Sequence, residues 1–432
     1  MHVIGIIAEF NPFHLGHSYL IEKAREEVND PRAIVMVVMS GPFVQRGTPS
    51  ILPKSVRARS ALLCGADVVI ELPFTFACAP SERFAQGAVE LLYRTGVVTD
   101  IAFGTDCKNP ELIKLIADTT PSDDVIKQKM QEGLSFPSAR AEGIVAAVKA
   151  SRELNDEEEI LLRDALRQPN SILAADYLRA IRDVGAASRF KVHMIPRKEG
   201  YSATSSREVY LGQSGISSLV DPLSSLMPDK ALAAVLSGLS CRKYSFPKTD
   251  LYASDLINDI KRLDISPFAY MSDGLDGYIS NTLSSLKKQD YKSFRQSLQT
   301  KHFTMPRISR ALASLAVGQK NDYIKEEKHP RYIRVLGFNR DGRYCLKIMS
   351  KCAHLPILSN CSDAKELYAS DPALKAQHLL DVNAQEVQGR YLDIVPGTCR
   401  RVIPYRTKVN GVSVSILLSS KSSEMTVSVK LS

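Results

Sequence analysis

The sequence predicts an α/β fold with a parallel sheet, followed by a mainly helical segment and a smaller basic α+β part. Four short runs rich in β-branched residues, "HVIGIIA", "AIVMVVM", "DVVIELPF" and "DIAFG", recur at intervals of about 30 residues. Helical patterns fill the gaps, as in "HSYLIEKAREEV", whose apolar residues fall on one face. Because strands that alternate with helices form right-handed βαβ units, we expect a ligand site at the carboxyl ends of a parallel sheet.

The chain has 432 residues, which is too long for one ordinary core, and its pattern changes twice. Residues 1–210 hold the four runs and a further strand in "RFKVHMIPR". Residues 211–325 are mainly helical in pattern. Residues 326–432 are basic and β-rich, with pieces such as "YIRVLGFNRDGRYCLKIM" and "GVSVSILLSSKSSEMTVSVKL". We therefore expect three parts, of which the first carries the ligand site.

The composition is that of a globular protein, with 44% hydrophobic and 24% charged residues. No run approaches the roughly 18 apolar residues of a membrane span, and the N-terminus lacks a signal-peptide pattern. We expect a cytoplasmic protein without a membrane partner. The eight cysteines include no CxxC pair, which favours reduced thiols over a zinc ribbon or a disulfide framework.

The net charge of +9 is unevenly distributed. Residues 301–432 carry 21 Lys and Arg against 11 Asp and Glu, whereas residues 1–300 carry 35 against 36. A one-sided basic surplus is typical of a protein that binds a polyanion such as RNA. The alternative is a solvated surface with no partner.

The stretch "NPFHLGH" falls between the first expected strand and the first expected helix. A helix N-terminus offers unpaired N–H groups to an anion, and Gly16 lets the backbone come close to it. His14 and His17 are three residues apart, so both imidazoles can donate to the same phosphate group as its charge grows. The pattern predicts a triphosphate site with two catalytic histidines. No metal site is expected, because further zinc ligands are not evident nearby.

The pattern HxGH in this setting resembles the nucleotidyltransferase superfamily. A second superfamily signature is a Ser/Thr-rich turn followed by Arg, which holds the β and γ phosphates, and "SATSSR" at residues 202–207 fits it. Ser205 and Arg207 are its candidate ligands, because Arg forms charge-assisted bonds with phosphate. The alternative for this turn is a simple helix cap before "REVYLG".

A narrower resemblance covers most of the chain. The succession "GIIAEFNPFHLGHSYLI", "MSGPFVQRGTPSILPKSVRARSALLCGADVVIELPF", "SERFAQGAVELL", "FGTD", "QPNSILAADYL", "TKHFTMPRISR" and "YIRVLGFN" resembles the bacterial tRNA(Met) cytidine acetate ligase family. The resemblance implies a ligase that uses ATP to activate acetate as acetyl-adenylate. It also implies transfer of the acetyl group to the exocyclic amine of the wobble cytidine of elongator tRNA(Met).

The same resemblance places an ATP site in the first part, with Mg²⁺ expected alongside ATP and held largely by the phosphates. Gly104 of "FGTD", Asn170 of "QPNS" and Arg197 of "IPR" join the first loop there. With the Ser/Thr-rich turn, the expected ATP-site residues are Ile7, Ala8, Glu9, Phe10, Asn11, Pro12, Phe13, His14, Leu15, Gly16, His17, Ser18, Tyr19, Leu20, Gly104, Asn170, Arg197, Ser205 and Arg207.

Two further clusters carry candidate ligands for acetate, pyrophosphate or tRNA. The first is "SGPFVQRGTPSILPK", with Gln45, Arg46 and Lys54, which is also explained by a solvated loop. The second is "TKHFTMPRISR", where Lys301, Arg307 and Arg310 lie beside an aromatic residue, as in sites for single-stranded RNA. Its alternative is the capped start of the helix "RISRALASLAV". The resemblance assigns tRNA binding to residues 211–325 and 326–432.

Two other functions stay open from the sequence. One is an enzyme that adenylylates a small phosphorylated metabolite, which leaves the basic C-terminal surplus unexplained. The other is an RNA-binding protein that only senses ATP. The sequence assigns no base for the cytidine amine, no acetate pocket and no obligatory protein partner.

Overall fold

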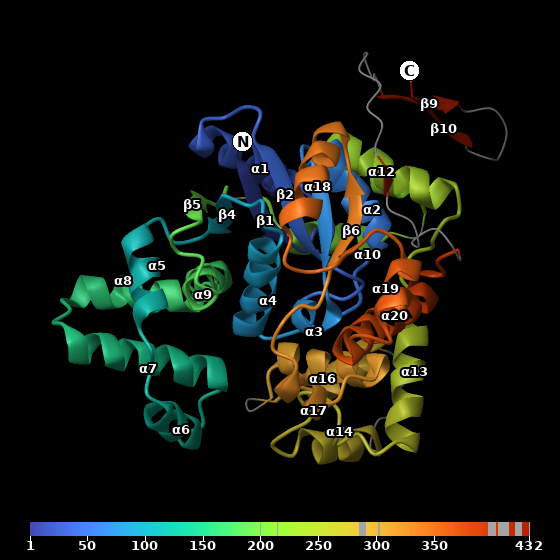
Figure 1. The fold of residues 1–432 in the computed structure, drawn as a ribbon. Coiled ribbons are helices and arrows are strands. Elements are labelled where there is room, and N and C mark those ends of the chain that lie inside the picture. Colours follow the sequence, from blue (N-terminus) through green and yellow to red (C-terminus); the bar gives the residue numbers. More distant parts are fainter. Residues whose placement is uncertain are drawn as a thin grey trace.

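The computed structural model describes residues 1–198, 200–213, 215–284, 291–300, 303–395, 403–404, 414–419 and 426–431 (Figure 1). The strands are β1 (Val3–Ala8), β2 (Ile34–Ser40), β3 (Val68–Leu72), β4 (Asp100–Thr105), β5 (Lys191–Pro196), β6 (Ile333–Phe338), β7 (Ile357–Leu358), β8 (Ile403–Pro404), β9 (Val414–Ser419) and β10 (Thr426–Leu431). The helices are α1 (Leu15–Val28), α2 (Lys54–Leu63), α3 (Phe74–Ala77), α4 (Ser81–Arg94), α5 (Pro110–Asp118), α6 (Asp123–Gln131), α7 (Phe136–Ser151), α8 (Asp156–Arg167), α9 (Pro169–Asp183), α10 (Ala203–Leu211), the 3₁₀ turn η1 (Ser217–Leu219), α11 (Val220–Ser224), α12 (Asp229–Ser240), α13 (Thr249–Arg262), α14 (Leu275–Ser284), α15 (Tyr291–Leu298), α16 (Met305–Val317), α17 (Asn321–Glu326), α18 (Arg340–Cys352), α19 (Cys361–Leu367) and α20 (Pro372–Leu392).

Eight of these strands form one sheet, in the order β5-β4-β1-β2-β3-β6-β7, with β8 also paired to β6. Strands β1 to β5 run parallel to one another, as the alternating pattern predicts. Strand β6 comes from much later in the chain and pairs antiparallel with β3, while β7 and β8 are parallel to β6. The predicted parallel sheet is therefore confirmed, and it is extended by a strand that the sequence pattern assigned to the C-terminal part.

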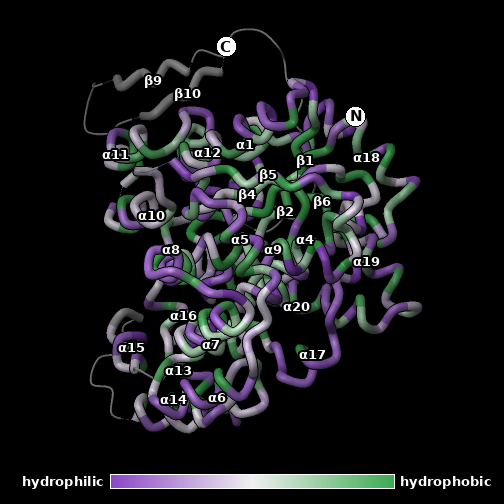
Figure 2. Tube along the Cα trace, turned by 90° about the vertical axis from the view of Figure 1, so that its left-hand side faces the viewer, coloured by the Kyte–Doolittle hydropathy of each residue, from purple (hydrophilic) through white to green (hydrophobic). Residues whose placement is uncertain are grey.

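Alternate residues of strands β1 to β4 enter two apolar layers, one on each face of the sheet. In β1, Ile4 and Ile6 join the layer covered by α1 and α2, whereas Val3 and Ile7 join the layer covered by α4, α9 and α18. Successive side chains of a strand point to opposite faces, so a strand buried on both faces is apolar throughout. Figure 2 shows the central strands as mostly hydrophobic, with more polar segments outside them.

The segment from 211 to 325 is helical in its described residues, and helices α12, α13, α16 and α20 contribute to the core layer that also contains α1 and α2. The division of the chain at 210 and 325 stays a prediction. Between 326 and 395 the β-rich expectation is wrong, because α18, α19 and α20 make up most of this stretch. Helix α18 starts directly after β6 because the side chain of Asn339 accepts from the backbone N–H of Gly342 at 2.8 Å. Asn360 and Asp371 are the N-caps of α19 and α20. Strands β9 and β10 lie in the predicted β-rich piece "GVSVSILLSSKSSEMTVSVKL" and pair antiparallel with each other.

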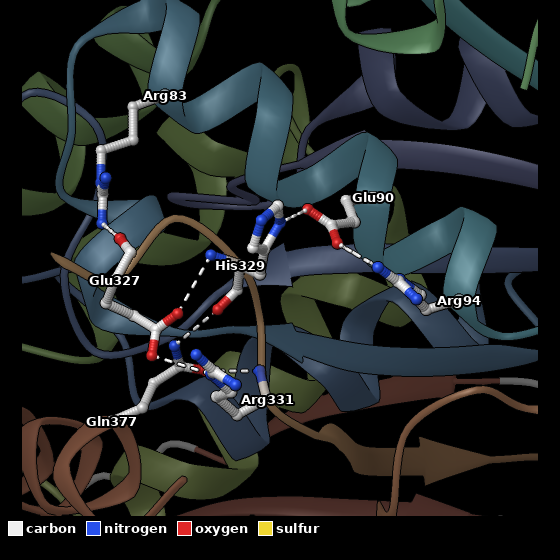
Figure 3. Close-up of polar contacts among 7 residues, drawn as sticks. All are labelled: Arg83, Glu90, Arg94, Glu327, His329, Arg331 and Gln377. Atoms are coloured by element: carbon white, nitrogen blue, oxygen red, sulfur yellow. Dashed lines mark hydrogen bonds and ion pairs between the residues drawn. The ribbon is translucent and has the colours of Figure 1, made fainter. Parts of the chain in front are cut away.

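A cluster of hydrogen bonds and ion pairs holds residues 327–331, where the chain returns from the helical segment to strand β6 of the sheet (Figure 3). Glu90 of α4 is 2% exposed and lies 2.8 Å from Nδ1 of His329. Arg83 of α4 donates to the backbone oxygen of Glu327 at 2.7 Å. Gln377 of α20 donates to the backbone oxygen of His329 at 3.2 Å. The segment before β6 is thus held by α4 on one side and α20 on the other.

Among the helices of the described residues, none is long and apolar enough to cross a membrane.

Candidate functional site

The candidate site lies at the carboxyl ends of β1, β4 and β5, where the loop after β1 leads into α1. This is the position at which parallel sheets bind ligands. The apolar residues Ile7 and Ala8 are buried in the end of β1, directly before this loop. The loop contains a cis peptide bond between Asn11 and Pro12.

His14 and His17 cap the first turn of α1 with their own rings. The backbone N–H of Gly16 donates to Nδ1 of His14 at 3.0 Å, and the backbone N–H of His14 donates to Nδ1 of His17 at 3.1 Å. A nitrogen that accepts a hydrogen bond carries no proton, so in each neutral ring the proton lies on Nε2. Both histidines therefore present an N–H donor, and the ring centroids are 3.7 Å apart.

Burial keeps both rings neutral. Burial, assisted by the positive charges of Arg197 and Arg207, lowers the pKa of His14 from 6.5 to about 4. Burial, followed by the effects of His14 and Arg197, lowers the pKa of His17 well below 6.5. At neutral pH the pair consists of two uncharged donors, which can stabilise charge that grows on a phosphate.

The small and aromatic residues of the motif hold these rings in place. Phe10 and Phe13 are each 1% exposed, and their ring centroids lie 4.8 and 5.4 Å from that of His17. A Cβ on Gly16 would lie 2.9 Å from Cε1 of His14 and 3.3 Å from Cβ of Tyr201. Gly16 is therefore required for the close approach of its neighbours.

The predicted Ser/Thr-rich turn starts α10 and reaches the first motif. Ser202 is the N-cap of α10 and accepts from the backbone N–H of Ser205 at 3.2 Å. Arg207 donates to the backbone oxygen of Asn11 at 2.9 Å and to Oγ1 of Thr204 at 2.9 Å. The turn is thus a helix cap and also brings Arg207 to the β1 loop. The two interpretations from the sequence, a phosphate-binding turn and a simple helix cap, are therefore compatible.

A cleft of about 520 Å³ opens between the ends of β4 and β5 and the start of α10. Asp106 forms its polar centre: Asn170 donates Nδ2 to one carboxylate oxygen at 2.7 Å, and Arg197 donates Nη1 to the other at 3.0 Å. A Cβ on Gly104 would lie 3.0 Å from Cγ of Arg197, so the glycine makes room for this arginine. The structure thus brings together Gly104, Asn170 and Arg197, and Asp106 joins them.

Sequence reasoning missed several residues of this cleft. Asp106 is the last residue of "FGTD", a motif from which only Gly104 was selected, and its carboxylate was the available signal. Lys198 directly follows the selected arginine, and its ammonium lies 5.6 Å from the ring centroid of Tyr201 and 6.0 Å from that of Tyr19. The remaining cleft residues outside the predicted set are Thr105, Lys108, Gln168, Pro196, Gly200, Tyr201 and Ser202.

The start of α1 has additional backbone ties. The N–H of Leu15 donates to the oxygen of Leu226 at 3.0 Å, and the N–H of Ser18 donates to that of His14 at 3.4 Å. Leu20 packs against the core layer beside α1. These residues position the helix start.

The loop between β2 and α2 places Gln45 and Arg46 next to Glu9. The backbone N–H of Gln45 donates to Oε1 of Glu9 at 2.7 Å. Burial raises the pKa of Glu9, while this bond and the positive charges of Arg207 and Arg46 oppose the rise. Arg46 is exposed at the tip of the loop. It remains a candidate ligand for an anion, whereas Gln45 acts through its backbone.

Lys54 does not line the cleft and instead forms a buried ion pair. Its side chain is 3% exposed, and its ammonium donates to both oxygens of Glu71 at 2.7 and 2.8 Å. Arg334 of β6 also pairs with Glu71, at 3.3 Å. A cation held in this way cannot reach a ligand from solution, so we withdraw Lys54 as a substrate ligand.

The cations of "TKHFTMPRISR" are engaged within the protein. Arg307 donates to Asp273 at 2.7 Å and to the backbone oxygen of Ser272 at 2.8 Å. Arg310 donates to the backbone oxygen of Gln45 at 3.3 Å, and burial lowers its pKa. Lys301 lies outside the described residues. Since both arginines already have partners, the geometry favours a structural role for them over contact with tRNA. Helix α16 does begin in this segment, at Met305, but its N-cap Thr304 forms no side-chain cap hydrogen bond.

Comparison with known proteins agrees with this geometry. The HIGH nucleotidyl transferase family matches residues 1–393. The tRNA(Met) cytidine acetate ligase of Acetivibrio thermocellus is 31% identical over 411 residues, which cover 90% of this chain and 94% of the relative. The tRNA(Met) cytidine acetate ligase of Thermosipho melanesiensis is 31% identical over 375 residues, which cover 84% of this chain and 85% of the relative.

The chain belongs to this family of HIGH nucleotidyl transferases. The resemblance found in the sequence is therefore confirmed. Among solved structures, Thermotoga maritima TmcAL bound with alpha-thio ATP has a TM-score of 0.81 and 27% identity, and covers 94% of this chain and 100% of its own. The apo form of the same protein also has a TM-score of 0.81. The predicted α/β nucleotidyltransferase fold is thus confirmed over nearly the whole chain.

Proposed function

We infer that this protein is an ATP-dependent ligase that activates acetate as acetyl-adenylate and acetylates the wobble cytidine of elongator tRNA(Met). The family supports ligase chemistry on tRNA, since its curated members are named tRNA(Met) cytidine acetate ligases. The observation that carries the proposal is the pair of neutral histidines at the start of α1. Each keeps an Nε2–H donor, and the positive charge of Arg197 acts on both rings.

In the proposed first step, ATP occupies the cleft with its phosphates at the start of α1. A carboxylate oxygen of acetate attacks the α phosphorus, the bond to the bridging oxygen breaks, and pyrophosphate leaves. His14 and His17 donate from Nε2 to the phosphate oxygens as charge grows there. Arg207, fixed by Asn11 and Thr204, offsets the charge of the leaving pyrophosphate.

The adenosine half of ATP would lie near Asp106. Because the Nδ2–H of Asn170 donates a hydrogen bond to Asp106, Oδ1 of Asn170 is left as an acceptor for a base or ribose donor. Arg197 is held by the same carboxylate and supplies positive charge between nucleoside and phosphates.

In the proposed second step, the cytidine amine attacks the acetyl carbonyl of the adenylate. A C–N bond forms, the bond to the phosphate oxygen breaks, AMP leaves, and the amine loses a proton. Water must be kept from the mixed anhydride, which is the role expected of the surrounding loops.

Mg²⁺ is proposed to accompany ATP. The cleft side chains include Lys108, Arg197 and Lys198, cations that fit phosphate oxygens rather than a metal ion. Phosphate oxygens would therefore supply most of the ligands of Mg²⁺, whose chemistry is to neutralise charge on the leaving pyrophosphate.

The test is to incubate the full-length protein with radiolabelled acetate, ATP and bulk tRNA, and to identify the labelled nucleoside by mass spectrometry. We expect label in tRNA as N4-acetylcytidine, with release of AMP and pyrophosphate. The His17→Ala variant is the matched negative control. If pyrophosphate is released with a phosphorylated metabolite but never with acetate, the protein adenylylates small molecules instead. Binding of ATP and tRNA without turnover would indicate an ATP-sensing RNA-binding protein.

A further inference from the structure

An exposed basic stripe runs along α18, on the helix that follows β6. It consists of Arg340, Arg343, Lys347 and Lys351, all exposed, with Tyr344 beside them at 60% exposure. At 3.6 residues per turn the four cations fall within an arc of about 80° over a length of about 16 Å. Gly342, Cys345 and Met349 lie on the opposite face of the helix and are buried.

The four cations of the stripe are not paired with acidic side chains among the described residues. In the part of the chain that the structure describes, none of them forms an ion pair within 4.0 Å. Some cations on other surface helices do pair one turn away, as Lys114 does with Glu111, Lys129 with Glu132, and Arg163 with Glu159. The single acid of α18 is Asp341, about 100° around the helix from Arg340. The positive charge of the stripe is therefore not neutralised locally.

The stripe lies at the end of the sheet opposite the cleft. Helix α18 begins beside Asp67, directly before β3, since a Cβ on Gly342 would lie 1.9 Å from the backbone oxygen of Asp67. It ends beside Gly96, before β4, where a Cβ would lie 2.2 Å from the oxygen of Cys352. The candidate site lies at the other ends of the strands. A strand of six residues is about 20 Å long, so the two places are separated by about that distance. A ligand that reaches both places must be large.

We propose that the α18 stripe binds the phosphate backbone of the tRNA whose anticodon enters the cleft. The proposal rests on the function inferred above and names a surface for that partner. One strand of a nucleic-acid duplex carries a phosphate about every 3.4 Å along the axis, so several phosphates face a stripe 16 Å long. Tyr344 offers a ring for stacking on an unpaired base or a hydroxyl for a phosphate.

The surface fits RNA better than a membrane. Helices that bind membranes through one face need an exposed apolar side next to their cations. The apolar side of α18 is packed into the core layer with α4 and α9. Only the polar side remains available, and it can contact a hydrated polyanion.

The test changes the four cations together: Arg340→Gln, Arg343→Gln, Lys347→Gln and Lys351→Gln in the full-length protein. A control variant with Lys114→Gln, Lys129→Gln, Arg163→Gln and Lys325→Gln removes the same charge from cations that have acidic partners. Binding of elongator tRNA(Met) is measured against salt concentration. We expect the α18 variant to bind at least about tenfold more weakly, with a salt slope reduced by about 0.7 to 0.9 for each lost contact, and the control to bind like the parent.

A Tyr344→Ala variant gives a second readout in case the fourfold variant does not fold. We expect it to weaken tRNA binding by about threefold to tenfold while leaving the salt slope unchanged, because stacking releases no counterions. Equal tRNA affinities and slopes in the α18 and control variants would overturn the proposal. So would salt-sensitive binding to phosphatidylserine vesicles without any difference in tRNA binding. Acetate-dependent pyrophosphate release without tRNA is measured in parallel, and its absence in the parent would contradict the ligase function rather than this surface.

Discussion

The backbone N–H of His14 donates to Nδ1 of His17 at 3.1 Å, so the first turn of α1 decides which nitrogen of His17 carries the proton. Replacing His17 by Ala removes the Nε2 donor. We expect acetate-dependent pyrophosphate release to fall by about 10² to 10³, the usual effect of losing a donor to the transition state. Binding of tRNA should persist. His354→Ala is the control, because His354 lies against Tyr93, away from α1. Parent-level pyrophosphate release by the His17 variant would contradict the catalytic role.

The lowered pKa of His14 predicts a loss of stability in mild acid. The unfolded chain takes up the His14 proton near pH 6.5, whereas the folded protein resists it down to about 4. The contribution of neutral His14 to stability is therefore complete above pH 6.5 and is lost as the pH falls toward 4. The loss lowers the unfolding free energy by about 3 kcal/mol. The lowered pKa of His17 acts in the same direction. Urea unfolding between pH 7.5 and 4.5 measures this loss.

The matched variant for this measurement is His14→Asn, since Asn keeps an N-cap acceptor but does not titrate. Its unfolding free energy should depend less on pH between 6.5 and 4.5 than that of the parent. Identical pH dependence in the two proteins would show that His14 does not resist protonation in the folded state.

Asp106 should set the affinity for ATP, because it holds both Asn170 and Arg197. With Asp106→Ala we expect the KM for ATP in pyrophosphate release to rise about tenfold, equivalent to roughly 1.4 kcal/mol, with a smaller change in kcat. Asp106→Asn keeps one acceptor oxygen and should give a smaller rise. Asp118→Ala removes an exposed carboxylate paired with Arg182 and serves as the control. An unchanged KM in the Ala variant would separate Asp106 from the nucleotide site.

The sequence allowed prediction of features that depend on local pattern. Strands β1 to β5 and the helix start at "HLGH" follow from periodicity and from the type of residue at a helix end. Partners distant in sequence were not predictable. Lys54 and Arg307 look like free cations in the sequence, and only the fold places Glu71 and Asp273 against them. The pairing of β6 with β3 joins segments more than 260 residues apart, and no short window carries that information.

Arg310 illustrates the consequence for function. Its side chain contacts the loop between β2 and α2, whose Gln45 donates to Glu9, so we expect Arg310 to position this loop rather than to bind tRNA. Arg310→Ala should lower kcat for pyrophosphate release in the absence of tRNA, and Arg310→Lys should restore part of it. Arg307→Ala is the matched control and should leave that rate near the parent level. A loss confined to tRNA binding would return Arg310 to the RNA interface.

Gly47 tests the contact between that loop and α16. It has φ +77°, and a Cβ there would lie 2.3 Å from the backbone nitrogen of Arg310 and 2.4 Å from the backbone carbon of Ser309. Gly133 has φ +93° but no atom within 4 Å of its Cβ position. Gly133→Ala is therefore the control, because it introduces the strain of a left-handed backbone without a steric clash. We expect Gly133→Ala to lower the unfolding free energy by about 1 to 2 kcal/mol. Gly47→Ala should cost about 1 to 3 kcal/mol more, because the loop must move away from the helix.

The same displacement should reach the active site through Gln45 and Glu9. Pyrophosphate release without tRNA, measured at a temperature where both variants are fully folded, should fall in Gly47→Ala and not in Gly133→Ala. Denaturant unfolding and this rate together distinguish two cases. If both glycine variants lose the same stability and keep the parent rate, the loop tolerates a side chain against α16 and the helix does not position it. If Gly47→Ala loses both stability and rate, the helical segment controls the geometry of the loop beside Glu9.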